Sequence, residues 1–267
     1  MINRFSQQTI WFLFMLTFAV SGCQRQPESD VDVLAYGPDV NAIVVTNDYT
    51  PRAIAATGGY QRWIKTKNIQ FDGVVTFYKP DGSFYLTEHH YEVYPWSNSI
   101  LISAYEPQGK LAWQLTGNSF SILGGAKQVD LPIALEGRYF AEAMRNIVTA
   151  PVRLLESKVV FTEELKPVKM EGLWYYPVEW TASDVNSDVA GYVKPSWSKI
   201  VFYQNKDSSL VDMIWFADTS GEKFLAVRGY DYSSVVKKGI LLPTRIEIFT
   251  TDFRGVLQQR LVKVDIY

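Results

Sequence analysis

Apolar and polar residues alternate along much of this chain, and the alternation predicts β-strands. From Ile69 to Phe77 the odd positions are apolar or glycine, and the even positions are mostly polar. A period of two places alternate side chains on opposite faces of an extended strand, so this segment should form a strand with one buried face. The closing segment Val262–Ile266 alternates in the same way.

Tight turns separate the predicted strands. Pro80-Asp81-Gly82 and Pro107-Gln108-Gly109 each combine a proline, which fixes φ, with a glycine, which accepts positive φ. Strands joined by such short turns are antiparallel, because parallel neighbours need a long crossover connection. We therefore expect an antiparallel meander with strands near 69–77, 83–93, 99–105, 110–116, 119–123, 159–165, 173–181, 197–204, 210–217, 223–230, 240–250 and 262–266.

One segment in the middle of the chain follows the period of a helix instead. Within residues 135–155, apolar side chains recur at i, i+4, i+7 and i+8, which places them on one face of a helix. These side chains are Phe140, Met144, Ile147 and Val148. Pro151 lies near the end of the segment and should kink or restart the helix.

A second helix is expected at residues 50–66, just before the first strand. Thr50 can cap a helix and Pro51 is tolerated in its first turn, whereas Gly58-Gly59 should weaken its middle. The order helix, meander, helix, meander predicts an α+β fold with one large antiparallel sheet. No internal linker interrupts this order, so residues 50–267 should form a single domain.

The N-terminus has the organisation of an export signal. Residues 9–20 form a nearly unbroken apolar run, shorter than the roughly 20 residues that a membrane-spanning helix needs. Arg4 precedes this run, and the small residues Ser21-Gly22 follow it. A basic start, a short apolar core and a small-residue cleavage site are typical of a secretory signal, so residues 1–22 are predicted to be a signal peptide.

Cys23 follows Ser21-Gly22 directly, and this arrangement resembles the lipobox of bacterial lipoproteins. The resemblance implies that Cys23 becomes the lipidated N-terminus and is held at a membrane by its acyl chains. Cys23 is the only cysteine, so the exported domain contains no disulfide. An ordinary signal peptide with a chance cysteine is the alternative. Residues 23–49 are predicted to form a flexible tether. Gln24 after the cysteine resembles the enterobacterial sorting pattern, which favours the periplasmic face of the outer membrane.

Charge and composition narrow the choice of partners. The formal net charge is −2, and without a basic excess the chain is not expected to bind nucleic acid. The chain contains 8 Trp, 16 Tyr and 15 Phe. Aromatic residues are enriched in strands, so this content fits either a β-rich core or an apolar cavity.

Residues that could carry chemistry are sparse. No catalytic motif is present and the only histidines are His89 and His90, so we do not predict an enzyme, although a Ser–His–Asp site built from distant residues stays open. Glu88, His90 and Glu92 should share one face of their strand. Two carboxylates and an imidazole can hold a divalent ion, but a solvent-facing polar stripe is the simpler interpretation. We therefore predict no metal site and no cofactor.

One predicted strand carries apolar residues on both faces. Within residues 210–216, the odd positions Val211, Met213 and Trp215 should share a face, and apolar residues also occupy the even positions. A sheet with one face in water should alternate more strictly, so both faces must be covered, either by protein or by a ligand. The apolar residues at even positions are Leu210, Ile214 and Phe216.

Several segments together resemble a known family. They are 55–63 (AATGGYQRW), 150–155 (APVRLL), 230–232 (YDY) and 239–246 (GILLPTRI). Their order resembles the LolA/LolB-like lipoprotein-carrier superfamily over residues 50–267. The resemblance implies an incomplete β-barrel: a strongly curved sheet with helices covering its open side and an apolar cavity between. Carriers of this kind hold lipoprotein acyl chains during transit across the periplasm. The chain differs in being longer, especially between 165 and 200, and in its own predicted lipidation.

These features lead to a hypothesis for function. We expect a membrane-anchored envelope lipoprotein that binds a lipid or lipoprotein acyl chain in the half-barrel, with the 135–155 helix as a movable lid. Burial alone can supply the binding energy, at roughly 0.8 kcal/mol per CH₂. The alternative is a structural lipoprotein with a filled core, which binds another protein through an edge strand such as the C-terminal one. The candidate lining residues, which plain core packing would also explain, are Phe77, Trp113, Phe140, Met144 and Trp215.

Overall fold

The computed structural model describes residues 48–106, 109–123, 136–155, 159–160, 166–181 and 196–267. All of them lie in one compact unit. The predicted signal peptide, Cys23 and the tether as far as residue 47 lie outside the described residues. None of the helices that the structure describes is long and apolar enough to cross a membrane.

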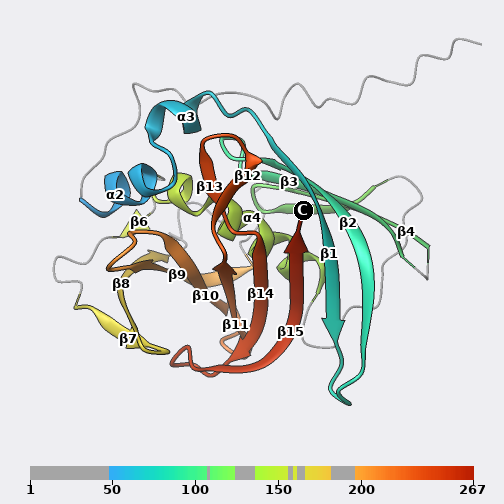
Figure 1. Cartoon of the computed structure of the whole chain (residues 1–267). Helices are drawn as coiled ribbons and strands as arrows, with labels where there is room; N and C mark the ends of the chain where they lie inside the picture. Colours follow the sequence, from blue (N-terminus) through green and yellow to red (C-terminus); the bar gives the residue numbers. More distant parts are fainter. Residues whose placement is uncertain (1–47, 107–108, 124–135, 156–158, 161–165, 182–195) are drawn as a thin grey trace, which may run out of the picture. The chain divides into compact units, whose positions relative to one another are not determined.

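An antiparallel sheet of thirteen strands dominates the described part of the chain (Figure 1). A separate hairpin joins β12 (Ser233–Lys237) to β13 (Ile240–Leu242). The strands of the large sheet are β1 (Ile69–Tyr78), β2 (Phe84–Tyr94), β3 (Ser99–Glu106), β4 (Gly109–Thr116), β5 (Ser119–Ile122), β6 (Val159–Val160), β7 (Val168–Met170), β8 (Leu173–Thr181), β9 (Trp197–Asn205), β10 (Val211–Asp218), β11 (Phe224–Tyr230), β14 (Arg245–Thr251) and β15 (Leu257–Ile266).

The first and the last strand of the domain lie side by side at the centre of the sheet. The order is β5-β4-β3-β2-β1-β15-β14-β11-β10-β9-β8-β6, with β7 paired to β8. The first strand therefore lies beside the last, with Val75 opposite Val264. Because β15 has a partner on each side, the expectation that the C-terminal strand is a free edge is wrong.

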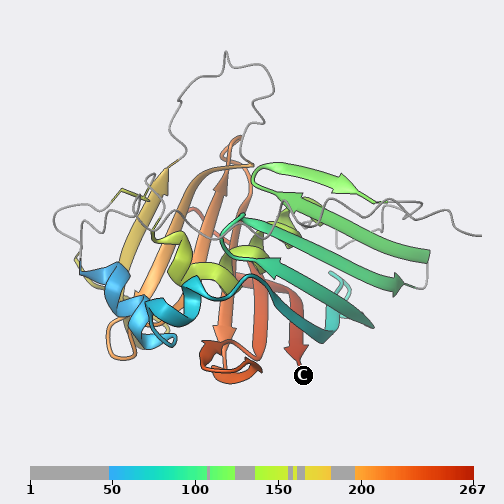
Figure 2. The same cartoon turned by 90° about the horizontal axis from the view of Figure 1, so that it is seen from above.

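The sheet curves around the helix α4 (Gly137–Arg153), as Figures 1 and 2 show. This helix contacts β3 and β4 from one half of the sheet and β10 and β11 from the other half. Among the strands that the structure describes, β5 and β6 at the two ends of the order do not pair with each other, so this sheet is not closed. The predicted α+β fold, a large curved antiparallel sheet with helices on its open side, is confirmed.

The helical period of the middle segment produces α4 almost as expected. Phe140, Met144, Ile147 and Val148 are all buried, and they face the concave side of the sheet. The predicted kink at Pro151 is not a break, because α4 runs through this residue and ends at Arg153. A proline in the last turn removes only one hydrogen bond of the helix, which the helix tolerates there.

The helix expected at 50–66 is two short helices, α2 (Tyr49–Ala56) and α3 (Tyr60–Ile64). Gly58 and Gly59 separate them with φ values of 121° and 88°, which belong to no right-handed helix. The break brings the chain close to β13: a Cβ on Gly58 would lie 2.1 Å from the carbonyl oxygen of Gly239. It also lets Trp63 become fully buried, with Nε1 donating to Thr57 Oγ1 at 3.0 Å.

Most strands lie close to their predicted positions, and the differences occur in short segments. The expected strand 240–250 is two strands, β13 and β14, separated at Pro243, which has no N–H to donate to a ladder. The short strands β7 and β12 were not expected. The strand expected at 159–165 is described only at β6, since residues 161–165 lie outside the described part.

Candidate functional site

Four of the five candidate lining residues meet on the concave side of the sheet. Phe77 on β1 and Trp113 on β4 belong to the same buried cluster as Phe140 and Met144 on α4. The ring centroid of Phe140 is 5.9 Å from that of Phe77 and 6.4 Å from that of Trp113. Phe77, Phe140 and Met144 are 0% exposed, and Trp113 is 1% exposed. The first three side chains have no solvent-accessible surface, so α4 fills the concave side of the sheet at this place.

His89 extends the same cluster, although the sequence did not single it out for this site. Its ring lies 5.9 Å from Phe140 in an edge-to-face arrangement and 6.0 Å from Phe77. The hydroxyl of Tyr91 lies 3.3 Å from His89 Nδ1. Alternation along β2 is the signal that places His89 on the apolar face, opposite to His90.

A pocket of about 360 Å³ lies beside this cluster, at the N-terminus of α4. A Cβ on Gly137 would lie 2.9 Å from Trp113 Cη2 and Cζ2, so the absence of a side chain lets the helix sit against the indole. The Trp113 Nε1 donor is buried and has no hydrogen-bond partner among the described residues. We call this pocket the α4 mouth; its lining residues are Trp113, Phe120, Ile122, Glu136, Gly137 and Arg138.

Two arginines on α4 fasten the helix to turns of the N-terminal meander. Arg145 Nη1 donates to the backbone carbonyls of Asn98 at 3.0 Å and Gly117 at 2.6 Å. Arg138 Nη2 donates to the carbonyl of Asn118 at 3.0 Å. Hydrogen bonds from charged donors are stronger than neutral ones, so these contacts position α4 against the sheet.

An ion pair at the surface holds the N-terminal end of α4 on its other flank. Lys223 Nζ lies 2.6 Å from Glu136 Oε1 and 5.1 Å from the centre of the Tyr139 ring. The hydrogen bond to Glu136 raises the pKa of Lys223. Tyr139 in turn packs on Trp197, with ring centroids 4.6 Å apart. Exposed pairs of this kind contribute only about 0–1 kcal/mol, so this end of the helix is weakly held on that flank.

Trp215, the fifth candidate, lies on the outer, convex side of the sheet. It belongs to a second buried cluster with Tyr203 and Met213, separate from the cluster around α4. Its ring stacks on Phe224 at 5.7 Å, and its Nε1 donates to Thr251 Oγ1 at 2.9 Å. Trp215 therefore does not share a site with the other four candidates.

A β-bulge in β10 places its side chains on other faces than the alternation predicted. The register with β9 shifts between Val211 and Met213, so one extra residue is inserted there. Val211 consequently joins Ile214 and Phe216 in the concave core, instead of sharing a face with Met213 and Trp215. A bulge of this kind reverses the alternation of side chains, and nothing in the hydrophobic pattern marks it.

Glu88, His90 and Glu92 form a polar stripe on the outer side of β2. His90 Nδ1 lies 2.8 Å from Asp72 Oδ1 on β1, and His90 Nε2 lies 3.9 Å from Glu92 Oε1. Asp72 is opposite His90 in the register with β1, and Ser103 is opposite it in the register with β3. Glu92 lies two residues along β2 itself. In the part of the chain that the structure describes, no group of three or more His, Cys, Asp or Glu residues is placed to hold a metal ion.

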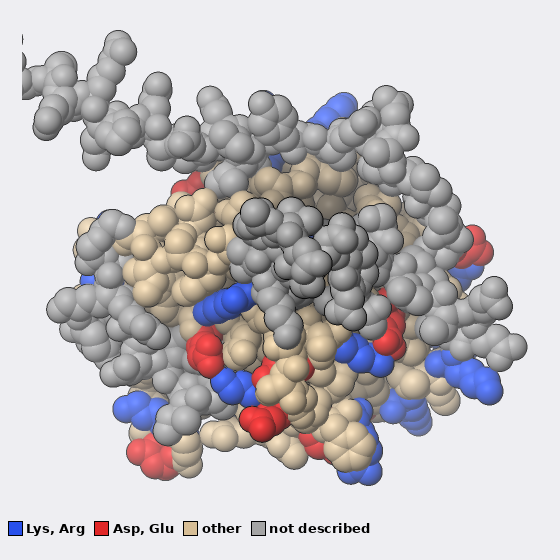
Figure 3. Space-filling view, turned by 180° about the vertical axis from the view of Figure 1, so that it is seen from behind, with Lys and Arg blue, Asp and Glu red and all other residues tan. Residues whose placement is uncertain are grey.

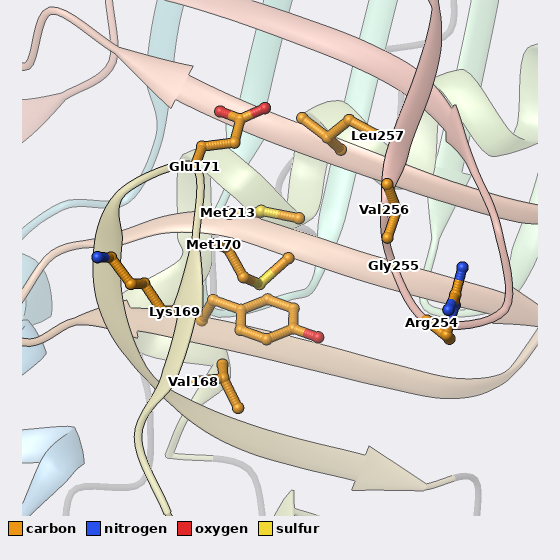
Figure 4. Close-up of a pocket in the computed structure, with 10 residues that line it drawn as sticks. Val168, Lys169, Met170, Glu171, Met213, Arg254, Gly255, Val256 and Leu257 are labelled. Carbon is orange, nitrogen blue, oxygen red and sulfur yellow. The ribbon is translucent and has the colours of Figure 1, made fainter.

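A groove of about 420 Å³ lies over the second buried cluster, between two hairpins (Figure 4). The β7–β8 hairpin forms one wall with Met170, and the β14–β15 turn forms the other with Val256. Met213 and Tyr203 lie between them as the floor, and burial raises the pKa of Tyr203 to about 12. The charged ends of its polar lining residues lie at the edge of the groove in Figure 4. We call this space the outer groove.

Several solved structures are similar to this fold. A LolA superfamily protein from Nitrosomonas europaea matches with a TM-score of 0.53 at 15% sequence identity, over 84% of this chain and 92% of that chain. A DUF1329 family protein from Desulfovibrio piger matches with a TM-score of 0.45 at 10% identity, over 82% and 90% of the two chains. A domain described as outer membrane lipoprotein-sorting, from Vibrio parahaemolyticus, matches with a TM-score of 0.40 at 10% identity, over 74% and 83%.

No family model matches the sequence, and no curated protein matches it. The likeness to the Nitrosomonas protein extends over nearly all of that protein and most of this chain, so it concerns the whole architecture of the sheet and its helices. At 15% identity this likeness shows the fold alone. The predicted resemblance is confirmed at that level: the described domain has a LolA-like fold.

Proposed function

We propose that this protein is an envelope-anchored binding protein that holds an apolar ligand, a lipid or a lipoprotein acyl chain, between α4 and the concave side of the sheet. The α4 mouth is the observation that carries the proposal, because it leads from the surface to Trp113 and the aromatic cluster behind it. The LolA-like fold supports a ligand at this place. Burial of a hydrocarbon chain needs no specific polar motif, which agrees with the scarcity of such motifs in the sequence.

Binding at this place requires α4 to move. Phe140 and Met144 occupy the space that an acyl chain would fill. Exposing two such side chains costs about 1.5–3 kcal/mol each, while each methylene removed from water contributes roughly 0.8 kcal/mol. About four to eight methylenes therefore offset the exposure of these two side chains, so a chain shorter than about four methylenes should not bind.

The N-terminal end of α4 is the end that we expect to open. The exposed pair between Glu136 and Lys223 is weak, and Arg138 can exchange the carbonyl of Asn118 for water. The C-terminal end is tied to α2, where Thr50 Oγ1 donates to the carbonyl of Leu154 at 3.2 Å. The helix would then act as a lid that opens at the mouth.

The anchoring and location that we propose rest on the N-terminal sequence. Residues 1–22 would be removed, Cys23 would carry the lipid, and the tether would place the domain at the periplasmic face of the outer membrane. We propose no enzymatic activity. On the side seen in Figure 3, basic and acidic side chains are interspersed instead of gathered into a patch of one sign, which gives no support to a nucleic-acid partner.

A filled core is the observation that favours a second candidate. Phe77, Phe140 and Met144 have no exposed surface, as expected for an envelope lipoprotein whose sheet is solid and whose partner is another protein. The two candidates differ in one measurable property, which is the uptake of an apolar chain.

Native mass spectrometry with organic extraction tests the proposal on the Cys23→Ala chain exported to a bacterial periplasm. We expect one lipid per chain, and at least a tenfold loss of bound lipid in Ile122→Glu, which adds a charge at the mouth. Val235→Glu is the matched control. Ile122 is 41% exposed and Val235 is 74% exposed, but Val235 lies on β12, away from the mouth. A clean apo mass with no uptake of added fatty acid would favour the filled-core candidate.

A further inference from the structure

The β7–β8 hairpin is held across the outer side of the sheet by an ion pair. Glu171 and Gly172 form the tip of this hairpin with φ values of 47° and 86°, a conformation typical of two-residue hairpin turns. The Glu171 carboxylate pairs with Arg228 Nη1 on β11. Arg228 is opposite Met213 in the register of β10 and β11, so its side chain is on the outer side of the sheet, beside a residue of the groove floor.

The pair joins two groups in different environments. The Arg228 side chain is 10% exposed, whereas that of Glu171 is 51% exposed. A buried guanidinium needs an acceptor, because a charge without a partner is costly away from water. Glu171 provides that acceptor from an exposed hairpin turn at the wall of the groove, so another anion could take its place on Arg228.

The surroundings of Arg228 favour an anion over a cation. Its Nη2 lies 3.5 Å from the Tyr175 hydroxyl, and its guanidinium lies 5.1 Å from the centre of the Tyr230 ring. Glu247 is opposite Arg228 on β14, but its carboxylate is paired with Arg260 at 3.3 Å. Two more cations, Lys169 and Arg254, line the outer groove, and Asp252 pairs with the second of them at 3.0 Å.

We propose that the outer groove binds a single-chain anionic amphiphile, a fatty-acid carboxylate, whose headgroup replaces Glu171 on Arg228 while its chain lies along Met213, Tyr203 and Leu257. The groove volume of about 420 Å³ lies within the range of sites for small molecules. Apolar residues form its floor and charged residues its edge, which matches the two ends of such a ligand. This site is independent of the ligand proposed above, because it lies on the other side of the sheet from α4.

Tryptophan quenching by a bromine-tagged dodecanoate can tell the two sides apart. Trp215 borders the outer groove, since a Cβ on Gly255 would lie 3.5 Å from its Cδ1, and Trp113 borders the α4 mouth. In the full chain carrying Cys23→Ala, we expect a saturable component of the quenching that Trp215→Phe removes and Trp113→Phe leaves unchanged. A second component that Trp113→Phe removes would report the concave site. Quenching that depends only on Trp113 would overturn this inference and support the concave site alone. The absence of any saturable quenching would overturn both.

The headgroup is tested with charge variants and the uncharged analogue dodecanol. We expect Glu171→Gln to strengthen dodecanoate binding at least threefold, because it removes the competing carboxylate, and Arg228→Gln to weaken it at least tenfold. Neither variant should change the binding of dodecanol. Arg228 is buried and its variant could unfold, but Glu171 lies in an exposed turn, so its variant remains decisive. Unchanged dodecanoate affinity in Glu171→Gln, or quenching of Trp215 by a bromine-tagged dodecanol as tight as by the dodecanoate, would overturn the inference.

Discussion

Replacing Gly137 with alanine tests whether the first turn of α4 is fitted to Trp113. Helix propensity alone predicts a gain, since glycine inside a helix costs about 0.5–1 kcal/mol relative to alanine. The contact predicts the opposite sign, because the new Cβ would lie 2.9 Å from the Trp113 ring. This ring is buried and packs against Phe120 and Phe140, whose centroids lie 6.0 and 6.4 Å away, so moving it costs packing contacts.

The magnitude follows from these two opposing effects. Overpacking of this kind costs about 1–3 kcal/mol, so after the propensity gain the free energy of unfolding should fall by about 0.5–2 kcal/mol. Urea denaturation followed by far-UV circular dichroism measures this change at constant m value. In a chain that carries Trp113→Leu, the ring is absent and Gly137→Ala should be neutral or stabilising.

Two results would refute this reasoning about Gly137. One is a stabilising effect of Gly137→Ala in the wild-type chain, and the other is an equal cost in both backgrounds. A functional consequence accompanies the stability effect. The new methyl group should push the N-terminal end of α4 away from Trp113, so uptake of a fluorescent fatty acid through the mouth should become faster than in wild type.

Three further outcomes can be measured with simple variants. Met144→Ala empties a fully buried position, so it should lower the free energy of unfolding by about 2–5 kcal/mol in urea, while the control Tyr105→Ala, at an 86% exposed residue, should change it by less than about 0.5 kcal/mol. Burial raises the pKa of Asp212 from 3.8 to about 6, so the folded state binds an extra proton between these values. Stability should therefore decline as pH rises from about 4 to 6, by up to about 3 kcal/mol, and urea titrations of Asp212→Asn should lack this decline. Cys23→Ala should move the protein from the membrane pellet to the soluble fraction, and retention in the pellet would contradict the lipid anchor.

Strong periodicity explains why most of the fold could be predicted from the sequence. The first strand was expected at 69–77 and is Ile69–Tyr78, and the helix expected at 135–155 is Gly137–Arg153. In the strand one face is buried and the other is mostly polar. In the helix the apolar side chains recur on one face, although the polar residues Glu142, Arg145 and Asn146 are buried as well. The hydrophobic period therefore marks both elements. Alternation also placed Glu88, His90 and Glu92 together on the outer side of β2.

The missed elements have little or no periodicity of their own. The strand β7 has three residues and β12 has five, and neither buries a regular face. Both are held by pairing with a neighbouring strand, β8 and β13 respectively, which is a tertiary contact that a single segment does not encode. The outer groove could not be predicted for the same reason, because its wall is the β7–β8 hairpin.

The candidate site shows where reasoning from a hydrophobic pattern stops. The pattern of β10 correctly indicated that both faces of the sheet are covered, but burial is non-directional, so it could not tell protein from ligand as the cover. Trp113 and Trp215 were equally plausible lining residues by composition, and they lie on opposite sides of the sheet. On the concave side α4 leaves no exposed surface on Phe140 and Met144. On the outer side Met213 is also nearly buried, at 1% exposed, but it lines a groove between two hairpins. The ligand proposed for the concave side would therefore have to displace α4, whereas the ligand proposed for the outer side would enter an existing groove and displace the carboxylate of Glu171.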